Sequence, residues 1–368
     1  MSPRKPRRVI PVLAGEEPEG RTLQEELDRH TLPGELWQAE DGNSVRCFAC
    51  GHRCLIRDGR RGICRVRFNR DGTLYVPRGY AAGVQVDPIE KKPFYHLLPG
   101  SDCLTFGMLG CDFHCGYCQN WLTSQTLRDP AAGGVASVLS AETLVRLGRQ
   151  HGARAVASSY NEPLITAEWG VEVFRAARAA GLRTAFVSNG NATPEVLDFI
   201  RPWTDGYKID FKAIQDRTYR SLGGVLQHVL DAMRMVYERG FWCEIVTLVV
   251  PGFNDDVGDL RRMADAIAAI SPTMPWHVTA FHQDYKMTDP RNTTVDDLVR
   301  ACEIGRDAGL KFMYAGNLPG RVGRWEHTWC PDCGDLLIER FGYQIRQQRV
   351  TPAGLCPSCG ARIPGIWS

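Results

Sequence analysis

The 368-residue sequence lacks the long apolar run that a membrane helix requires. No such run approaches the roughly 18 residues that cross a bilayer, and residues 1–20 lack the apolar centre of a secretory signal. The net charge is only +2, so the surface as a whole should attract neither nucleic acid nor membrane. We therefore expect a cytoplasmic globular protein. Residues 1–22 carry the basic stretch at 3–8, which we interpret as a mobile arm rather than a polyanion contact.

Cysteine, by contrast, is abundant, with fourteen residues in the chain. A reducing cytoplasm disfavours disulfides, and clustered cysteines in an intracellular chain more often bind metal or perform redox chemistry. Cys103, Cys243 and Cys302 stand alone and are expected to be buried, inert thiols. The others form three groups, of four, three and four residues: Cys47, Cys50, Cys54 and Cys64; Cys111, Cys115 and Cys118; Cys330, Cys333, Cys356 and Cys359.

Between residues 104 and 317, short β-branched runs alternate with longer amphipathic segments, several of which open on Ser, Thr or Asp and close on Gly. The expected strands are 104–109, 155–161, 183–189, 206–213, 243–252, 276–282 and 311–317. The expected helices are 140–152, 167–181, 193–203, 225–240, 257–270 and 295–309. This alternation predicts βαβ units and a parallel sheet. We predict an α/β protein with a partial (β/α)6-type TIM barrel at 101–320, a four-cysteine module and linker at 23–100, and a zinc ribbon at 321–368.

Polar stretches follow the expected strands, where the working residues of a barrel collect. They are the cysteine triplet, YNEP, SNGN, IDFK, VPGFNDD and AFHQDYK, the last ending at residue 286. Each alone is compatible with ordinary loop chemistry. Six at the same end of one sheet indicate a bound ligand.

The cysteine triplet has one thiol fewer than an iron–sulfur cluster ordinarily uses. Three ligands would leave one iron open, as a catalytic centre needs, although a zinc site completed from elsewhere is the alternative. The segment Cys111-Asp-Phe-His-Cys115-Gly-Tyr-Cys118 resembles the CxxxCxxC motif of radical S-adenosylmethionine (SAM) enzymes. The resemblance implies a [4Fe–4S] cluster whose fourth iron is chelated by SAM. It implies an oxidoreductase-like or group-modifying enzyme that cleaves SAM to methionine and a 5′-deoxyadenosyl radical, which abstracts hydrogen from a substrate.

The same resemblance implies cofactor contacts for residues near the strand ends. Tyr117 matches an aromatic residue placed against the adenine, and Glu162 falls where a glutamate contacts the amino group of SAM. Asn189, Asp210 and Lys212 resemble residues that contact the ribose and carboxylate in the pyruvate formate-lyase activating enzyme branch. A low-potential electron donor of the flavodoxin or ferredoxin type is implied as well.

A narrower likeness covers the chain from about residue 30 to its end. The segments that carry it resemble the AmmeMemoRadiSam-system radical SAM enzymes; they are 47–67, 87–101, 159–165, 275–287, 309–320 and 356–367. That family is named for neighbours encoding an AMMECR1-domain protein and a Memo-like protein, which are therefore candidate partners. The resemblance does not indicate a substrate.

The two four-cysteine groups are predicted to bind metal. Cys330, Cys333, Cys356 and Cys359 form two CxxC pairs with a hairpin-like segment between them, typical of a closed, structural zinc ribbon, with rubredoxin-type iron as the alternative. For Cys47, Cys50, Cys54 and Cys64 we predict zinc, with an auxiliary iron–sulfur cluster as the alternative.

His277, His282 and Tyr285 lie on or after the sixth expected strand and are candidate substrate contacts, with a hydrogen-bonded structural role as the alternative. The run at 90–96, with two lysines, a tyrosine and a histidine, is either a solvated loop or a functional segment. Three functions remain in competition. They are a radical SAM enzyme with an unknown substrate, a glycyl-radical-enzyme activase, and a non-catalytic scaffold held together by zinc. The intact triplet and the matching cofactor motifs favour the first.

Overall fold

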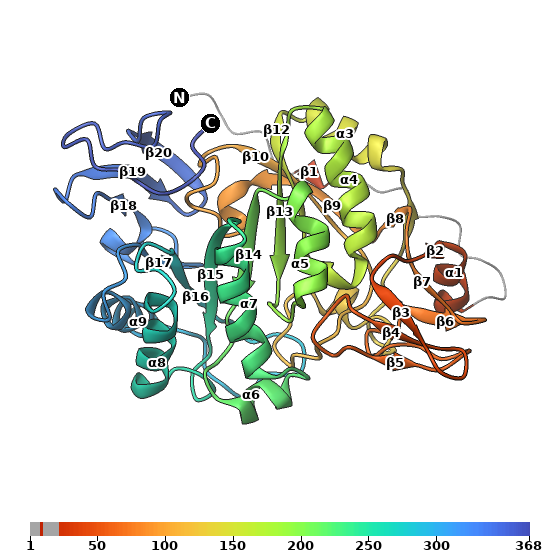
Figure 1. Ribbon diagram of the computed structural model, residues 1–368. Helices are drawn as coiled ribbons and strands as arrows, with labels where there is room; N and C mark the ends of the chain where they lie inside the picture. Colours follow the sequence, from red (N-terminus) through yellow and green to blue (C-terminus); the bar gives the residue numbers. More distant parts are fainter. Residues whose placement is uncertain (1–7, 10–21) are drawn as a thin grey trace. The chain divides into compact units, whose positions relative to one another are not determined.

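The structure is a computed structural model that describes residues 8–9 and 22–368 (Figure 1). Most of the predicted arm at 1–22 lies outside the described residues. Strand β1 (Arg8–Val9) is described and pairs antiparallel with β9 (Gly83–Pro88). The chain divides into two compact units, one of residues 1–87 and 102–205 and the other of residues 88–101 and 206–368. This division passes through the segment 101–320 predicted as a barrel, and the predicted domain limits stay a prediction.

The first unit contains a sheet in the order β9-β10-β12-β13, in which the last three strands run parallel (Figure 1). These strands are β10 (Asp102–Gly107), β12 (Ala153–Ser158) and β13 (Arg183–Ser188). The helices of this part are α2 (Trp121–Ser124), α3 (Ala141–Gln150), η2 (Pro163–Thr166), α4 (Ala167–Ala179), α5 (Pro194–Ile200) and η3 (Arg201–Trp203). An N-cap fixes the start of α5. The Thr193 hydroxyl accepts a hydrogen bond from the Val196 N–H, and the helix begins at the next residue, Pro194, shortly after β13 ends.

The first unit also holds the cysteine-rich module, which precedes the parallel strands in the sequence. Helix α1 (Leu23–Arg29) precedes two small antiparallel sheets, ordered β2-β7-β6 and β3-β4-β5. Their strands are β2 (Thr31–Pro33), β3 (Trp37–Glu40), β4 (Ser44–Cys47), β5 (Leu55–Ile56), β6 (Phe68–Arg70) and β7 (Thr73–Pro77), followed by the pair β8 (Tyr80–Ala81) and β11 (Ser137–Val138). The buried Arg67 guanidinium donates to both carboxylate oxygens of Glu168 on α4, at 2.7 and 2.8 Å. This bidentate pair ties the module to the parallel sheet.

The second unit contains four parallel strands in the order β14-β15-β16-β17 (Figure 1). They are β14 (Gly206–Asp210), β15 (Trp242–Val249), β16 (Trp276–Ala280) and β17 (Met313–Gly316). The helices between them are α6 (Asp216–Ser221), α7 (Leu226–Glu238), α8 (Val257–Ala268) and α9 (Val295–Asp307). The register pairs His277 with Tyr314 on neighbouring strands, so the two side chains share one face.

The C-terminal part of the second unit is a three-stranded antiparallel sheet. After η4 (Gly323–Glu326) come β18 (Thr328–Trp329), β19 (Leu336–Phe341) and β20 (Gln344–Gln348), with β19 and β20 as the predicted hairpin. Its apolar residues pack in one buried cluster with Tyr95 and Tyr314. The run at 90–96 is therefore no solvated loop: η1 (Ile89–Lys91) and the residues after it enter this core, and His96 is fully buried.

All predicted strands and helices between residues 104 and 317 are present, so the mixed α/β fold is confirmed. In residues 8–9 and 22–368, no helix is both long and apolar enough to span a membrane.

Candidate active site

Three thiols lie in the loop that follows β10. Cys115 is buried, Cys111 and Cys118 are partly exposed, and none of the three forms a disulfide. The loop opens at Gly110, whose φ of +91° favours glycine; a Cβ there would also lie 2.9 Å from a Val66 methyl. The chain therefore turns sharply into the cysteine segment. Three soft ligands within eight residues of one loop are a donor set that fits an iron–sulfur cluster.

Without a bound cation, the protein environment favours the protonated form of the Cys111 thiol. Burial, with the neighbouring Asp112 carboxylate adding to it, raises the pKa of the Cys111 thiol well above its ordinary value. The Cys118 sulfur lies 3.1 Å from the Ser124 hydroxyl at the end of α2. A bound cation would reverse the electrostatic balance and deprotonate these groups, as metal sites do.

Glu162 follows β12 and is 2% exposed. Its Oε1 accepts from the Ser188 hydroxyl at 2.7 Å and from the Leu164 N–H at 3.1 Å, and its Oε2 accepts from the Asn189 N–H at 2.6 Å. Burial raises the pKa of this carboxyl to about 8, with the charge of Asp112 as the second cause. A carboxylate offers about four lone-pair sites. By this count Oε2, which accepts one hydrogen bond from the protein, has the capacity to accept a second, such as one from an ammonium group.

Asp112 is the residue that the sequence analysis missed. Its carboxylate is fully buried, Oδ1 accepts from the Asn189 side-chain amide at 2.7 Å, and Oδ2 accepts from the Asn191 side-chain amide at 2.8 Å. The Asn189 side-chain oxygen in turn accepts from the Asn191 N–H at 2.9 Å. Asp112 occupies a variable position of the CxxxCxxC spacing and so carried no signal of its own. The two asparagines after β13, which need buried acceptors, were the available hint.

The other predicted cofactor residues are placed as follows. Tyr117 is buried within the cysteine loop, and Asn189 joins Glu162 and Asp112. Asp210 and Lys212 belong to the second unit, where Asp210 forms ion pairs with Lys208 and, at 3.3 Å, with Lys212. Burial raises the pKa of Asp210, but the two lysine charges outweigh it and hold the pKa below its ordinary value.

Of the three candidate substrate residues, His277 is buried. Its Nε2 lies 2.7 Å from Glu244 Oε2, the Tyr95 ring meets it edge-on at 4.7 Å, and the Tyr314 ring stacks on it at 5.0 Å. These contacts support the structural alternative for His277. His282 is exposed and Tyr285 partly buried in the segment after β16.

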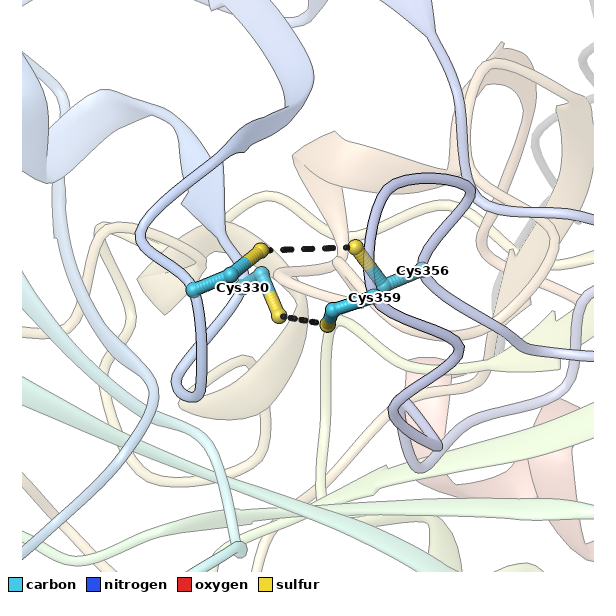
Figure 2. A group of neighbouring side chains, drawn as sticks. Cys330, Cys356 and Cys359 are labelled. Carbon is cyan, nitrogen blue, oxygen red and sulfur yellow. Dashed lines mark hydrogen bonds between the residues drawn. The ribbon is translucent and has the colours of Figure 1, made fainter.

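The four C-terminal cysteines form the tightest group of candidate metal ligands. In the part of the chain that the structure describes, they are the one set of cysteine, histidine and acidic side chains whose ligand atoms all lie within 4.8 Å of one another. Figure 2 shows the two short sulfur–sulfur contacts, 3.6 Å between Cys330 and Cys359 and 3.7 Å between Cys333 and Cys356. Each CxxC segment forms the same kind of turn. The Gly334 N–H donates to the Cys330 carbonyl, and the Gly360 N–H donates to the Cys356 carbonyl. Four thiols at these distances could hold one metal ion.

The N-terminal cysteines are less tightly gathered. Cys47, Cys50 and Cys64 are buried and Cys54 is partly exposed. Burial raises the pKa of the Cys64 thiol to about 11. The loop that carries Cys50 contacts the segment after β13, because the Gly51 N–H donates to the Asn191 carbonyl at 2.8 Å. The module therefore lies beside the cysteine triplet within the first unit.

Known proteins resemble this chain over much of its length. A solved radical SAM methyltransferase from Sphaerobacter thermophilus covers 80% of each chain with 14% identity and a TM-score of 0.48. The pyruvate formate-lyase 1-activating enzyme of Escherichia coli is 25% identical over 234 residues, which are 59% of this chain and 93% of that enzyme. An uncharacterised protein of Methanocaldococcus jannaschii is 32% identical over 331 residues, 89% of this chain and 97% of that protein. The profile of the Radical SAM superfamily matches residues 106–264, which include the cysteine loop and Glu162. The chain belongs to the radical SAM superfamily and is an enzyme.

Proposed function

We propose that the protein holds a [4Fe–4S] cluster on Cys111, Cys115 and Cys118 and binds SAM beside it. The observation that carries the proposal is the set of three thiols, none of them in a disulfide, in the loop after β10, with the buried Asp112 carboxylate among them. When bound, the cluster and SAM supply a 5′-deoxyadenosyl radical that abstracts hydrogen from a substrate of unknown class. An electron donor of the flavodoxin or ferredoxin type would reduce the site.

The residues of this chain would bind and orient SAM. Glu162 would accept from the ammonium group through the free position on Oε2, while its three protein donors fix the carboxylate. We assign Tyr117 to the adenine and Asn189, Asp210 and Lys212 to the ribose and carboxylate. We also propose the partial (β/α)6-type barrel for residues 101–320, supported by the parallel strands that alternate with helices in each unit.

Replacing Glu162 by glutamine should weaken SAM binding by about tenfold or more, because a charge-assisted hydrogen bond is lost. In the wild type, SAM binding should tighten as the pH rises from 6 toward 8, because Glu162, with a pKa of about 8, must lose its proton to receive the ammonium. The Glu162→Gln variant should show little of this pH dependence. Equilibrium dialysis at pH 6, 7 and 8 measures both effects. Equal affinity of the two proteins at pH 8 would assign the role to another residue.

We propose structural zinc for both four-cysteine groups. In the C-terminal group the four sulfur atoms already lie within 4.8 Å of one another, as ligands of one ion would. Burial raises the pKa of the Cys356 thiol, but hydrogen bonds from the N–H groups of Cys359 and Ser358 outweigh burial and lower the pKa to about 7. In the N-terminal group one zinc ion would have to draw the thiols together. A four-iron cluster would require less movement, which keeps an auxiliary cluster as the alternative there.

Metal analysis tests both assignments. The wild type should contain about four irons and two zincs per chain, and a variant with Cys111, Cys115 and Cys118 all replaced by alanine should contain no iron and the same two zincs. About four irons left in the triple variant would identify the N-terminal group as an auxiliary cluster. A wild type without iron would contradict the proposed function itself.

The substrate and partners are proposed from resemblance. The Escherichia coli relative favours a glycyl-radical activase as second candidate, whose substrate would be a backbone glycine of a large partner. The AmmeMemoRadiSam likeness favours AMMECR1-domain and Memo-like partners instead. Membership in an enzyme superfamily argues against the scaffold alternative.

A further inference from the structure

We infer that Asp112 is a positioning residue for SAM: its carboxylate fixes the asparagines after β13, and through Asn189 it orients the N–H that holds Glu162. Asp112 would not touch the cofactor. The inference deepens the proposed function and rests on it for the identity of the ligand.

The Asp112 carboxylate lies in a fully buried environment. A fully buried carboxylate is costly unless it is paired or well hydrogen-bonded. Glu168 in the same unit has Arg67 as its bidentate partner. Asp112 instead has two neutral amides, the Cys111 thiol at 3.7 Å and the His52 ring at 3.9 Å. Within the described residues, Asp112 forms no ion pair with a lysine or arginine.

A second buried carboxylate lies close by. Glu162 accepts only from hydroxyl and backbone N–H groups, and the nearby Asp112 carboxylate adds to the cost of ionising it. A cation beside Glu162 would favour the ionised form of this carboxyl. The ammonium group of SAM is such a cation, so its binding would offset part of the electrostatic cost.

Asn189 connects the carboxylates of Glu162 and Asp112. Asn189 donates its backbone N–H to Glu162 Oε2 and its side-chain amide to Asp112 Oδ1. Asn191 occupies the other Asp112 oxygen, and its N–H holds the Asn189 side-chain oxygen. With both ends of its amide engaged, the Asn189 side chain cannot rotate without breaking two hydrogen bonds. Asp112 thereby fixes the direction of the N–H that orients Glu162.

The test is an exchange of hydrogen-bonding partners. In Asp112→Asn one carboxylate oxygen becomes an NH₂ group, which faces an amide NH₂ of Asn189 or Asn191, so one donor meets another donor. The double variant Asp112→Asn/Asn191→Asp restores a donor–acceptor pair and keeps one carboxylate. The matched control is Asp205→Asn. The Asp205 carboxylate accepts from the N–H and hydroxyl of Thr184, at the opposite end of β13 from Asn189.

Two measurements on anaerobically reconstituted protein distinguish a positioning role from loss of the folded, cluster-bound state. The first is the iron content. The second is the SAM affinity, taken from the change that SAM causes in the electron paramagnetic resonance spectrum of the reduced cluster. All variants should retain the iron of the wild type. Asp112→Asn should bind SAM about tenfold more weakly, the double variant within about threefold of the wild type, and Asp205→Asn like the wild type.

Wild-type affinity in Asp112→Asn with full iron content would overturn the inference. Equal weakening in Asp112→Asn and Asp205→Asn, or no recovery in the double variant, would overturn it as well. If Asp112→Asn is insoluble, Asn191→Ser takes its place, because it removes the amide donor and leaves the Asp112 carboxylate. This variant should also bind SAM more weakly than the wild type. Unchanged affinity in Asn191→Ser would overturn the inference too. A wild type that holds iron and binds no SAM would instead refute the proposed function.

Discussion

Alanine at Cys111, Cys115 or Cys118 should abolish the release of 5′-deoxyadenosine from SAM. Each thiol would hold one iron, and no fourth protein ligand is proposed to replace a missing one. The fold should persist, because the three thiols lie in a loop and Cys111 and Cys118 are partly exposed. Anaerobic incubation with dithionite and SAM, followed by mass spectrometry of the products, measures the loss, and circular dichroism checks the fold.

The matched control is Cys302→Ala. Cys302 is a fully buried, free thiol on α9, outside all three cysteine groups. This variant should release 5′-deoxyadenosine like the wild type, apart from a modest loss of stability. Undiminished product from any of the three loop variants would refute the ligand assignment.

Alanine at Glu244 should cost about 3–5 kcal/mol of stability in the second unit. The fully buried carboxylate accepts from the N–H groups of Tyr95 and His96 and from the Trp242 indole, each at 2.9 Å, and it pairs with His277 at 2.7 Å. Its removal leaves these donors without an acceptor in a buried site. Urea unfolding followed by tryptophan fluorescence measures the change.

The same carboxylate gives the stability a pH dependence. Burial raises the pKa of Glu244, but its hydrogen bonds outweigh burial and hold the pKa below the ordinary 4.5. Its contribution is therefore present above pH 4.5 and lost as the pH falls through the lower pKa of the folded state. Glu303→Gln, on the exposed side of α9, should unfold like the wild type. An equal midpoint for Glu244→Ala would contradict the structural role of this network.

The parallel strands and their helices could be predicted because their signals are local. Apolar runs, helix caps such as Thr193 and closing glycines all act within a few residues. The three thiols of the cysteine loop were visible for the same reason, since their spacing lies within one segment. Their partners were not, because Asp112 meets Asn189 and Asn191 across 77 and 79 positions of the chain.

The run at 90–96 shows the same limit in the second unit. Its charged and aromatic residues read locally as a loop, yet the Tyr95 and His96 N–H groups donate to Glu244, and His96 Nε2 lies 2.6 Å from the Tyr314 hydroxyl, 218 positions away. Residues that pair over such separations have no periodic pattern. For His277, the contact with Glu244 likewise comes from a neighbouring strand, and only the fold reveals that it is buried.

The most direct test of the central claim is the fate of SAM on the wild-type protein. Anaerobically reconstituted enzyme, reduced with dithionite and supplied with SAM, should release 5′-deoxyadenosine and methionine in equal amounts. The same preparation should contain about four irons that depend on Cys111, Cys115 and Cys118. A protein that holds this iron, is fully reduced and leaves SAM intact would contradict the account.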